Sequence, residues 1–172
     1  MNLVTDGAPA LALGLEKGEP GMMGRPPRPT TEPIINRSMR LGLALQAVAV
    51  TAVSLLAFWM GMHLFGGELA ARTMAFVVLS GCQLLRAYTN RSERASLFSI
   101  GVFGNKWMQY AVAASTVLLL AVVYLPGVNT VFNAVPLSAL QWASIAPLLL
   151  IPAAVDELTK LGLRVAERRR KA

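Results

Sequence analysis

The sequence has very few residues able to hold a soft metal or to form a disulfide. Its 172 residues include one cysteine, Cys82, and one histidine, His63. A single cysteine excludes a disulfide within the chain, and one thiol with one imidazole cannot build a structural zinc site. Oxygen atoms are therefore the ligands left for any metal site in this chain.

Charged residues are also scarce, and their placement is uneven. They make up 15% of the chain against roughly 25% in soluble domains, and mean hydropathy is +0.53. Three stretches of 27, 13 and 49 residues contain no Asp, Glu, Lys or Arg: 41–67, 73–85 and 107–155. A membrane-spanning helix needs about 20 apolar residues. The first stretch therefore predicts one span and the third predicts two, divided near Pro126 and Pro136.

The middle stretch is the weakest candidate for a span. Its 13 residues form only about 20 Å of helix, so a span requires Arg72 and Arg86 to reach toward opposite interfaces, or the helix to pack inside a bundle. A re-entrant or buried soluble helix is the alternative. We predict four full helices, at about 40–64, 70–88, 107–125 and 140–157.

Basic residues gather on one side of these predicted spans. Of sixteen Lys and Arg residues, only Arg72 falls in a loop on the other side, and fifteen lie in or beside 14–40, 86–106 and 158–172. The positive-inside rule places those three segments in the cytoplasm. Topology and anionic lipid explain the net charge of +7, so a nucleic-acid partner is not needed. The polar, acidic segment after Met1 does not resemble a secretory signal, so none is expected.

The first thirteen residues combine oxygen ligands with helix-breaking residues. Asn2, Thr5 and Asp6 lie in an otherwise apolar stretch that Gly7 and Pro9 interrupt. A carboxylate in an apolar helix is costly and marks a candidate functional site in a membrane protein. A break in the helix there frees backbone carbonyls to bind a hard cation together with side-chain oxygens. The alternative in a soluble protein is an Asx turn after a short strand.

Three polar segments border the predicted spans. Five of the ten prolines fall within 20–33, which predicts an extended connector, with a proline-rich ligand for a partner domain as the alternative. The loop at 90–98 is predicted to be a solvated turn with local ion pairs. Glu157 and Lys160 have the i,i+3 spacing that permits a weak surface pair.

Several short motifs, taken in order, resemble the C-terminal transmembrane region of P-type cation-transporting ATPases of the sarco/endoplasmic-reticulum-type calcium pump class and its bacterial relatives. The motifs are Asn2-Leu-Val-Thr5-Asp6-Gly7-x-Pro9, Arg25-Pro26-Pro27-Arg28, Arg91-Ser92-Glu93 and Asp156-Glu157-Leu158-x-Lys160. They resemble the sixth helix, the connector after it, the loop between the eighth and ninth helices, and the exit of the tenth. The resemblance covers essentially the whole chain.

The predicted fold is an all-α, polytopic transmembrane helical bundle with one truncated helix plus four full helices. Four segments are expected: the second half of a broken cation-site transmembrane helix, a cytoplasmic Pro-rich connector, a four-helix transmembrane domain and a basic cytoplasmic tail, at 1–13, 14–38, 39–160 and 161–172. Because Met1 falls within a helix, a fragment, an internal start or half of a split gene is expected.

The resemblance also assigns candidate ion ligands. Asn2, Thr5 and Asp6 match cation-coordinating positions of the sixth helix, and their oxygens suit Ca²⁺ or Mn²⁺ as the transported ion. Gln83 falls where the two-calcium pumps have a coordinating glutamate. Because its amide is neutral, the resemblance implies one ion per cycle in the parent pump.

The sequence lacks the family's motifs for ATP chemistry. It has no phosphorylation motif Asp-Lys-Thr-Gly, no nucleotide-binding loop and no Thr-Gly-Glu, and it lacks the fourth and fifth helices that supply further ligands. We expect no catalytic residue, no cofactor and no activity from this chain alone. The expected partners are the lipid bilayer and the remainder of the pump, in cis or in trans, in a bacterial plasma membrane. The connector around 16–28 is expected to couple headpiece movement to the helices.

Two other classes of function fit the sequence. One is a small non-enzymatic membrane protein that binds or regulates a complete pump. The other is a small secondary transporter that uses Asp6, but this would need a complete first span, and residues 1–13 are too short for one.

Overall fold

The computed structural model describes residues 6–16, 37–92 and 97–171, with single positions at 18, 24, 33 and 35. This part of the chain is helical and contains no strand. Its four long helices are α3 (Arg37–Leu64), α4 (Glu68–Thr89), α6 (Lys106–Tyr124) and α8 (Ala139–Lys171). The described residues also form three short helices: α2 (Gly7–Gly14) precedes the long ones, and α5 (Leu97–Ile100) and α7 (Val128–Val131) lie between them in the sequence. Most of the predicted connector lies outside the described residues.

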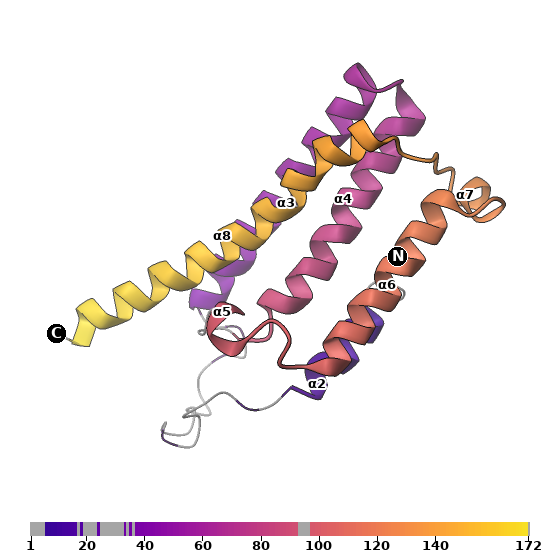
Figure 1. Ribbon diagram of the computed structural model, residues 1–172. Coiled ribbons are helices and arrows are strands. Elements are labelled where there is room, and N and C mark those ends of the chain that lie inside the picture. The colour runs from indigo at the N-terminus through magenta and orange to yellow at the C-terminus, as the bar shows by residue number, and fades with distance from the viewer. Residues whose placement is uncertain are drawn as a thin grey trace.

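The four long helices carry segments long and apolar enough to cross a membrane: Met39–Leu64, Glu68–Thr89, Lys106–Tyr124 and Ala139–Val165. The predicted all-α bundle with four full helices is therefore confirmed. Helices α3, α4 and α8 pack on one another, while α6 packs against α4, and α2 lies against α6 and α4 (Figure 1).

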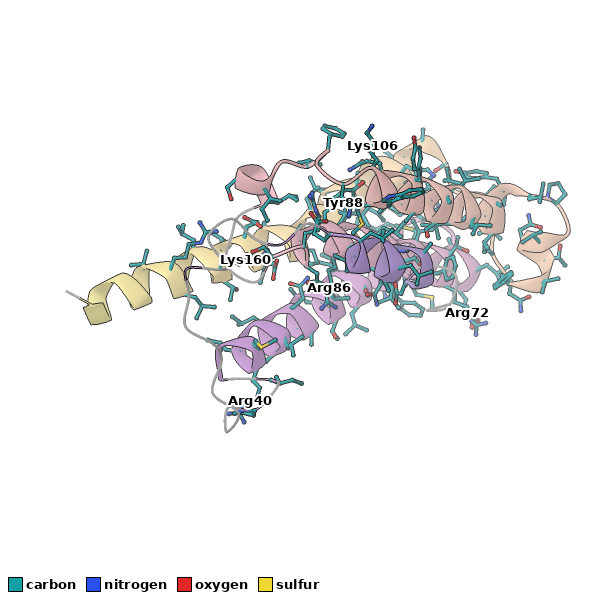
Figure 2. The ribbon with its side chains drawn as sticks, turned by 90° about the horizontal axis from the view of Figure 1, so that it is seen from below. Arg40, Arg72, Arg86, Tyr88, Lys106 and Lys160 are labelled. Carbon is teal, nitrogen blue, oxygen red and sulfur yellow. The ribbon has the colours of Figure 1, made fainter. Side chains whose placement is uncertain are left out.

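Helix α4, the weakest candidate in the sequence, is the central helix of the bundle. Half of its apolar segment is buried, against fewer than a third of the segment in each of the other three long helices. Its 22 residues extend about 33 Å. Arg72 and Arg86 lie toward opposite ends of it, and Arg72 forms an exposed pair with Glu68 (Figure 2). Packing inside the bundle therefore explains why a short charge-free stretch is sufficient for a span.

The α3–α4 crossing is built on very small residues. A Cβ added at Gly61 on α3 would lie 2.3 Å from the Cα of Ala71 on α4, so only glycine allows this approach. The turn between the helices contains Gly66 and Gly67, whose φ angles of +102° and +96° favour glycine. Further along, the α3, α4 and α8 side chains form one apolar core that includes the lone thiol of Cys82.

The environment of Lys160 on α8 differs from the predicted surface pair with Glu157. Its residue is only 6% exposed, and its Nζ lies 3.1 Å from Asp156 Oδ2 and 3.3 Å from Glu157 Oε1. The same ammonium group donates to the Thr89 carbonyl at the end of α4. Because α8 packs on α4 at this point, Lys160 is buried and its ammonium group connects α8 to α4. The predicted weak surface pair is therefore a buried interaction between two helices. A cation at the C-terminal end of α4 also complements the helix dipole.

Replacing Lys160 by methionine should destabilise the chain by about 2 kcal/mol, because two partly buried carboxylates lose their counter-charge and the Thr89 carbonyl loses its donor. The measurement is thermal unfolding in detergent, followed by a thiol-reactive fluorophore that reaches Cys82 only when the core opens. Arg72→Met, in the exposed pair with Glu68, is the matched control and should change the midpoint little. Equal shifts for both variants would contradict the buried role.

Candidate functional site

The predicted ion ligands at the start of the chain are only partly covered by the structure. Asn2 and Thr5 lie outside the described residues, so their placement stays a prediction. Asp6 is half-buried at the N-cap position of α2, and its carbonyl accepts a hydrogen bond from the Ala10 N–H at 2.8 Å. Pro9 lies in the first turn, where a helix has no use for the missing N–H. Gly7 and Pro9 therefore start a helix directly after the carboxylate.

Gln83, the fourth candidate, lies half-buried on α4. Helices α2, α4 and α6 meet at a buried apolar cluster that contains Ala12, Ala87 and Met108. Asp6 precedes Ala12 by six residues and Gln83 precedes Ala87 by four, which correspond to about 9 Å and about 6 Å of helix. Helices α2 and α4 run in the same direction (Figure 1). The two candidates therefore lie at similar depths in the bundle.

These two side chains cannot form a calcium site by themselves. Ca²⁺ takes six to eight oxygen ligands, and Asp6 and Gln83 bring at most two side-chain groups. Within the described ranges, no group of three His, Cys, Asp or Glu residues is close enough to hold a metal. Asp6 and Gln83 could supply at most part of the ligands of an ion site, and other segments would have to provide the rest.

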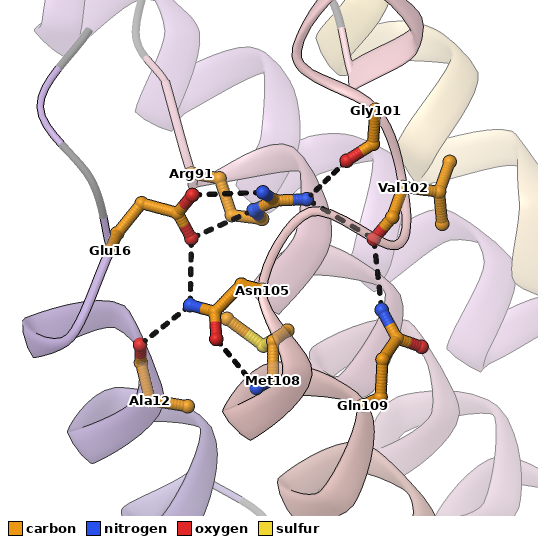
Figure 3. A network of polar contacts seen from close by, with 8 residues as sticks. All are labelled: Ala12, Glu16, Arg91, Gly101, Val102, Asn105, Met108 and Gln109. Atoms are coloured by element: carbon orange, nitrogen blue, oxygen red, sulfur yellow. Dashed lines mark hydrogen bonds and ion pairs between the residues drawn. The ribbon is translucent and has the colours of Figure 1, made fainter.

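The densest polar contacts of α2 lie at its other end, around Arg91 in the turn after α4. Arg91 forms a bidentate pair with Glu16, with Nε–Oε2 at 2.9 Å and Nη2–Oε1 at 2.8 Å (Figure 3). The Arg91 side chain is 1% exposed, and its Nη1 donates to the carbonyls of Gly101 and Val102 at 2.8 and 3.2 Å. Its guanidinium thus joins the end of α2 to the loop before α6.

Asn105, the N-cap of α6, binds the same segment. Its Nδ2 donates to the Ala12 carbonyl at 2.9 Å and to Glu16 Oε2 at 2.8 Å. Its Oδ1 accepts the Met108 N–H at 3.1 Å, as an N-cap side chain does. We call Glu16, Arg91 and Asn105 the polar clasp. Together they connect α2, the turn after α4 and the start of α6.

Charge and hydrogen bonding keep Glu16 ionised. Its hydrogen bond with the Arg91 side chain lowers the pKa of the Glu16 carboxyl below its usual value, although burial acts in the opposite direction, and the Asn105 amide adds to the lowering. A carboxylate with a depressed pKa stabilises the folded state above its unfolded pKa, and this contribution disappears as pH falls through the folded value. The Glu16 carboxyl is therefore ionised at neutral pH.

The sequence-based interpretation of the loop at 90–98 was wrong for Arg91. The predicted solvated turn with local ion pairs places Arg91 in water, whereas its partner is 75 residues away and its side chain is buried. The physical reason is that Glu16, just after α2, reaches Arg91, which buries the Arg91 side chain and leaves the Glu16 side chain 16% exposed. The one local signal was Asn105, a good N-cap residue two positions before the predicted span at 107–125.

Comparisons with known proteins agree with this architecture. The sequence profile of a family described as "Cation transporting ATPase, C-terminus" matches residues 1–162. The chain belongs to this family. It is 31% identical to calcium-transporting ATPase 1 of Bacillus cereus over 94% of its own length and 20% of the relative's.

Two further relatives give the same result. The chain is 34% identical to a calcium-transporting ATPase of Bacillus subtilis over 88% of its own length, and 32% identical to the mouse calcium-transporting ATPase type 2C member 2 over 99%. It spans only 17% and 18% of those two proteins. As a member of this family with four apolar helices, it is an integral membrane protein corresponding to the C-terminal membrane region of a P-type ATPase.

Proposed function

We propose that this chain is the C-terminal membrane portion of an ATP-driven calcium pump, where it supplies part of the ion site and a helix scaffold and is not active alone. The observation that carries this proposal is the family match over residues 1–162 to relatives that are calcium-transporting ATPases. Because the chain spans about a fifth of those relatives, ATP chemistry belongs to the remainder of the pump, acting in cis or in trans.

Asn2, Thr5 and Asp6 are the proposed ligands for the transported ion, with Gln83 as a neutral fourth group. Support comes from the half-burial of Asp6 beside α4 and α6 and from the similar depth of Gln83. A carboxylate, a hydroxyl and two amide oxygens are hard ligands that suit Ca²⁺, and Mn²⁺ accepts the same set. The ion is the pump's cargo.

The proposed orientation places the polar clasp at the cytoplasmic face of a bacterial plasma membrane. Arg40, Arg86 and Lys106 lie near the ends of α3, α4 and α6 on the clasp side, and Arg72 lies toward the opposite end of α4 (Figure 2). Lys160 of α8 donates to the Thr89 carbonyl on the clasp side of α4. This distribution follows the positive-inside rule. The connector after Glu16 and the basic tail at 161–172, of which 161–171 is the last part of α8, would then both be cytoplasmic.

The test is ATP-driven uptake of radioactive Ca²⁺ into vesicles that contain the full-length pump carrying this chain. We expect uptake with one Ca²⁺ transported per ATP hydrolysed, competition by Mn²⁺, and no uptake by the 172-residue chain alone. A ratio of two ions per ATP would contradict the expectation that the neutral Gln83 amide leaves the pump with a single ion site. Absence of any ATP-driven uptake of either ion would contradict the proposed function itself.

The regulator alternative is less well supported. A separate small protein that binds a pump has no reason to match the pump's own sequence, whereas this chain matches pumps over 88–99% of its length. The proposed pump portion accounts for that match directly.

A further inference from the structure

The position of α2 depends on contacts from outside the helix. Its 8 residues, Gly7–Gly14, lie against α6 and α4. Its buried residues are Pro9 and Ala12, two small side chains that offer little apolar area. Tertiary contacts must therefore fix both the direction and the depth of α2.

The polar clasp provides the directional contacts. Glu16 receives two hydrogen bonds from Arg91 and one from Asn105, and Asn105 also holds the Ala12 carbonyl. Hydrogen bonds that involve a charged group are shorter and stronger than those between neutral groups. All of these bonds act on the last turn of α2 and the residues just after it, whereas Asp6 lies at the opposite end of the same short helix.

The receiving side of the clasp is itself well anchored. The Arg91 guanidinium is bound by the carbonyls of Gly101 and Val102, and Gln109 on α6 donates to that same Val102 carbonyl at 2.8 Å. Tyr88 on α4 in turn donates to Gln109 at 2.9 Å. The clasp therefore holds the end of α2 against the turn after α4 and the start of α6, where further hydrogen bonds fix the Arg91 and Gln109 side chains (Figure 3).

We propose that Glu16, Arg91 and Asn105 are positioning residues for the ion site, because they fix α2, and with it Asp6, against α4 and α6. This inference rests on the proposed function. Glu16 lies just after α2 in the sequence and precedes the prolines of the predicted connector.

The experiment measures Ca²⁺-dependent ATP hydrolysis by the full-length pump. Glu16→Gln should raise the half-saturating Ca²⁺ concentration about tenfold, equivalent to about 1.4 kcal/mol, and lower kcat less than about twofold. Glu16→Asp should give an intermediate value, because it keeps the charge with a shorter reach. Arg91→Gln combined with Glu16→Gln should be no worse than the more severe single variant, because the two act as one unit.

Asn105→Asp separates positioning from folding. The carboxylate keeps an oxygen that caps the Met108 N–H, so α6 keeps its start, but it replaces the donor to Ala12 with a second negative charge beside Glu16. We expect the half-saturating Ca²⁺ concentration to rise by more than for Glu16→Gln. Should Glu16→Gln not fold, this variant still tests the proposal.

Glu68→Gln, in the exposed pair at the opposite end of α4, is the matched control and should leave the Ca²⁺ dependence unchanged. An unchanged half-saturating concentration in the clasp variants, or a fall in kcat alone, would overturn the inference while leaving the proposed function intact. Loss of Ca²⁺-dependent hydrolysis in the unmodified pump would instead contradict the proposed function.

Discussion

Asp6→Asn should abolish ATP-driven Ca²⁺ uptake by the full-length pump and raise the half-saturating Ca²⁺ concentration by about 100-fold or more. Asparagine has nearly the same size, so the substitution removes a charge and little else. A hard divalent cation draws most of its binding energy from carboxylates, and charge interactions are strong where water is excluded. The measurement is Ca²⁺-dependent ATP hydrolysis together with vesicle uptake of radioactive Ca²⁺.

Two comparisons make the Asp6 result interpretable. Glu68→Gln removes one carboxylate from an exposed surface pair and should behave like the parent. The clasp variants should change Ca²⁺ affinity far less than Asp6→Asn does, because they alter the position of the carboxylate and leave its charge. If Asp6→Asn transports Ca²⁺ with parental affinity, Asp6 is not an ion ligand.

Gly61→Ala should destabilise the chain by about 3 kcal/mol, near the upper end of the usual cost of overpacking. The added methyl group would lie 2.3 Å from the Cα and 2.6 Å from the N of Ala71, and both are backbone atoms that cannot rotate away. Helices α3 and α4 must therefore separate. Loss of protection of the Cys82 thiol on heating in detergent reports this, because that thiol lies in the core that the two helices share.

Gly42→Ala on the same helix is the matched control. The nearest atom to its added Cβ is the Thr159 methyl group at 4.0 Å, an ordinary contact. Alanine is the better helix former by roughly 0.5–1 kcal/mol, so this variant should equal or slightly exceed the parent in stability. The two Gly→Ala changes are thus expected to have opposite signs, and similar effects would refute the proposed crossing geometry.

The helices could be predicted from sequence because their signal is local. Long stretches without charge have few explanations other than burial in lipid, and the four helices follow from them. The charge pattern alone left α4 doubtful, since a 13-residue gap does not reveal that a helix will be surrounded by neighbours. Burial by other helices is a tertiary property, which hydropathy along one segment does not record.

The polar contacts were harder to predict for the same reason. Glu16 and Arg91 are 75 residues apart, and no spacing rule pairs them. Lys160 could be paired with Glu157 from its spacing, but its burial and its bond to Thr89 depend on how α8 packs on α4. For the proposed ion site, the chemistry of Asp6 in an apolar stretch led to the prediction, and its role as a ligand stays a proposal. The structure adds the half-burial of Asp6 and its similar depth to Gln83.

The glycine turn and the tight α3–α4 crossing have a consequence for how the protein enters its membrane. Helix α4 is the least apolar of the four spans, while α3, which precedes it by a three-residue turn, is the most apolar. A hairpin closed at Gly61 packs the small and apolar side of α4 against α3, and both helices precede α6 and α8 in the chain. Insertion of this pair as one unit would let the earlier segment carry the later one across, so biogenesis should depend on the glycine as much as folding does.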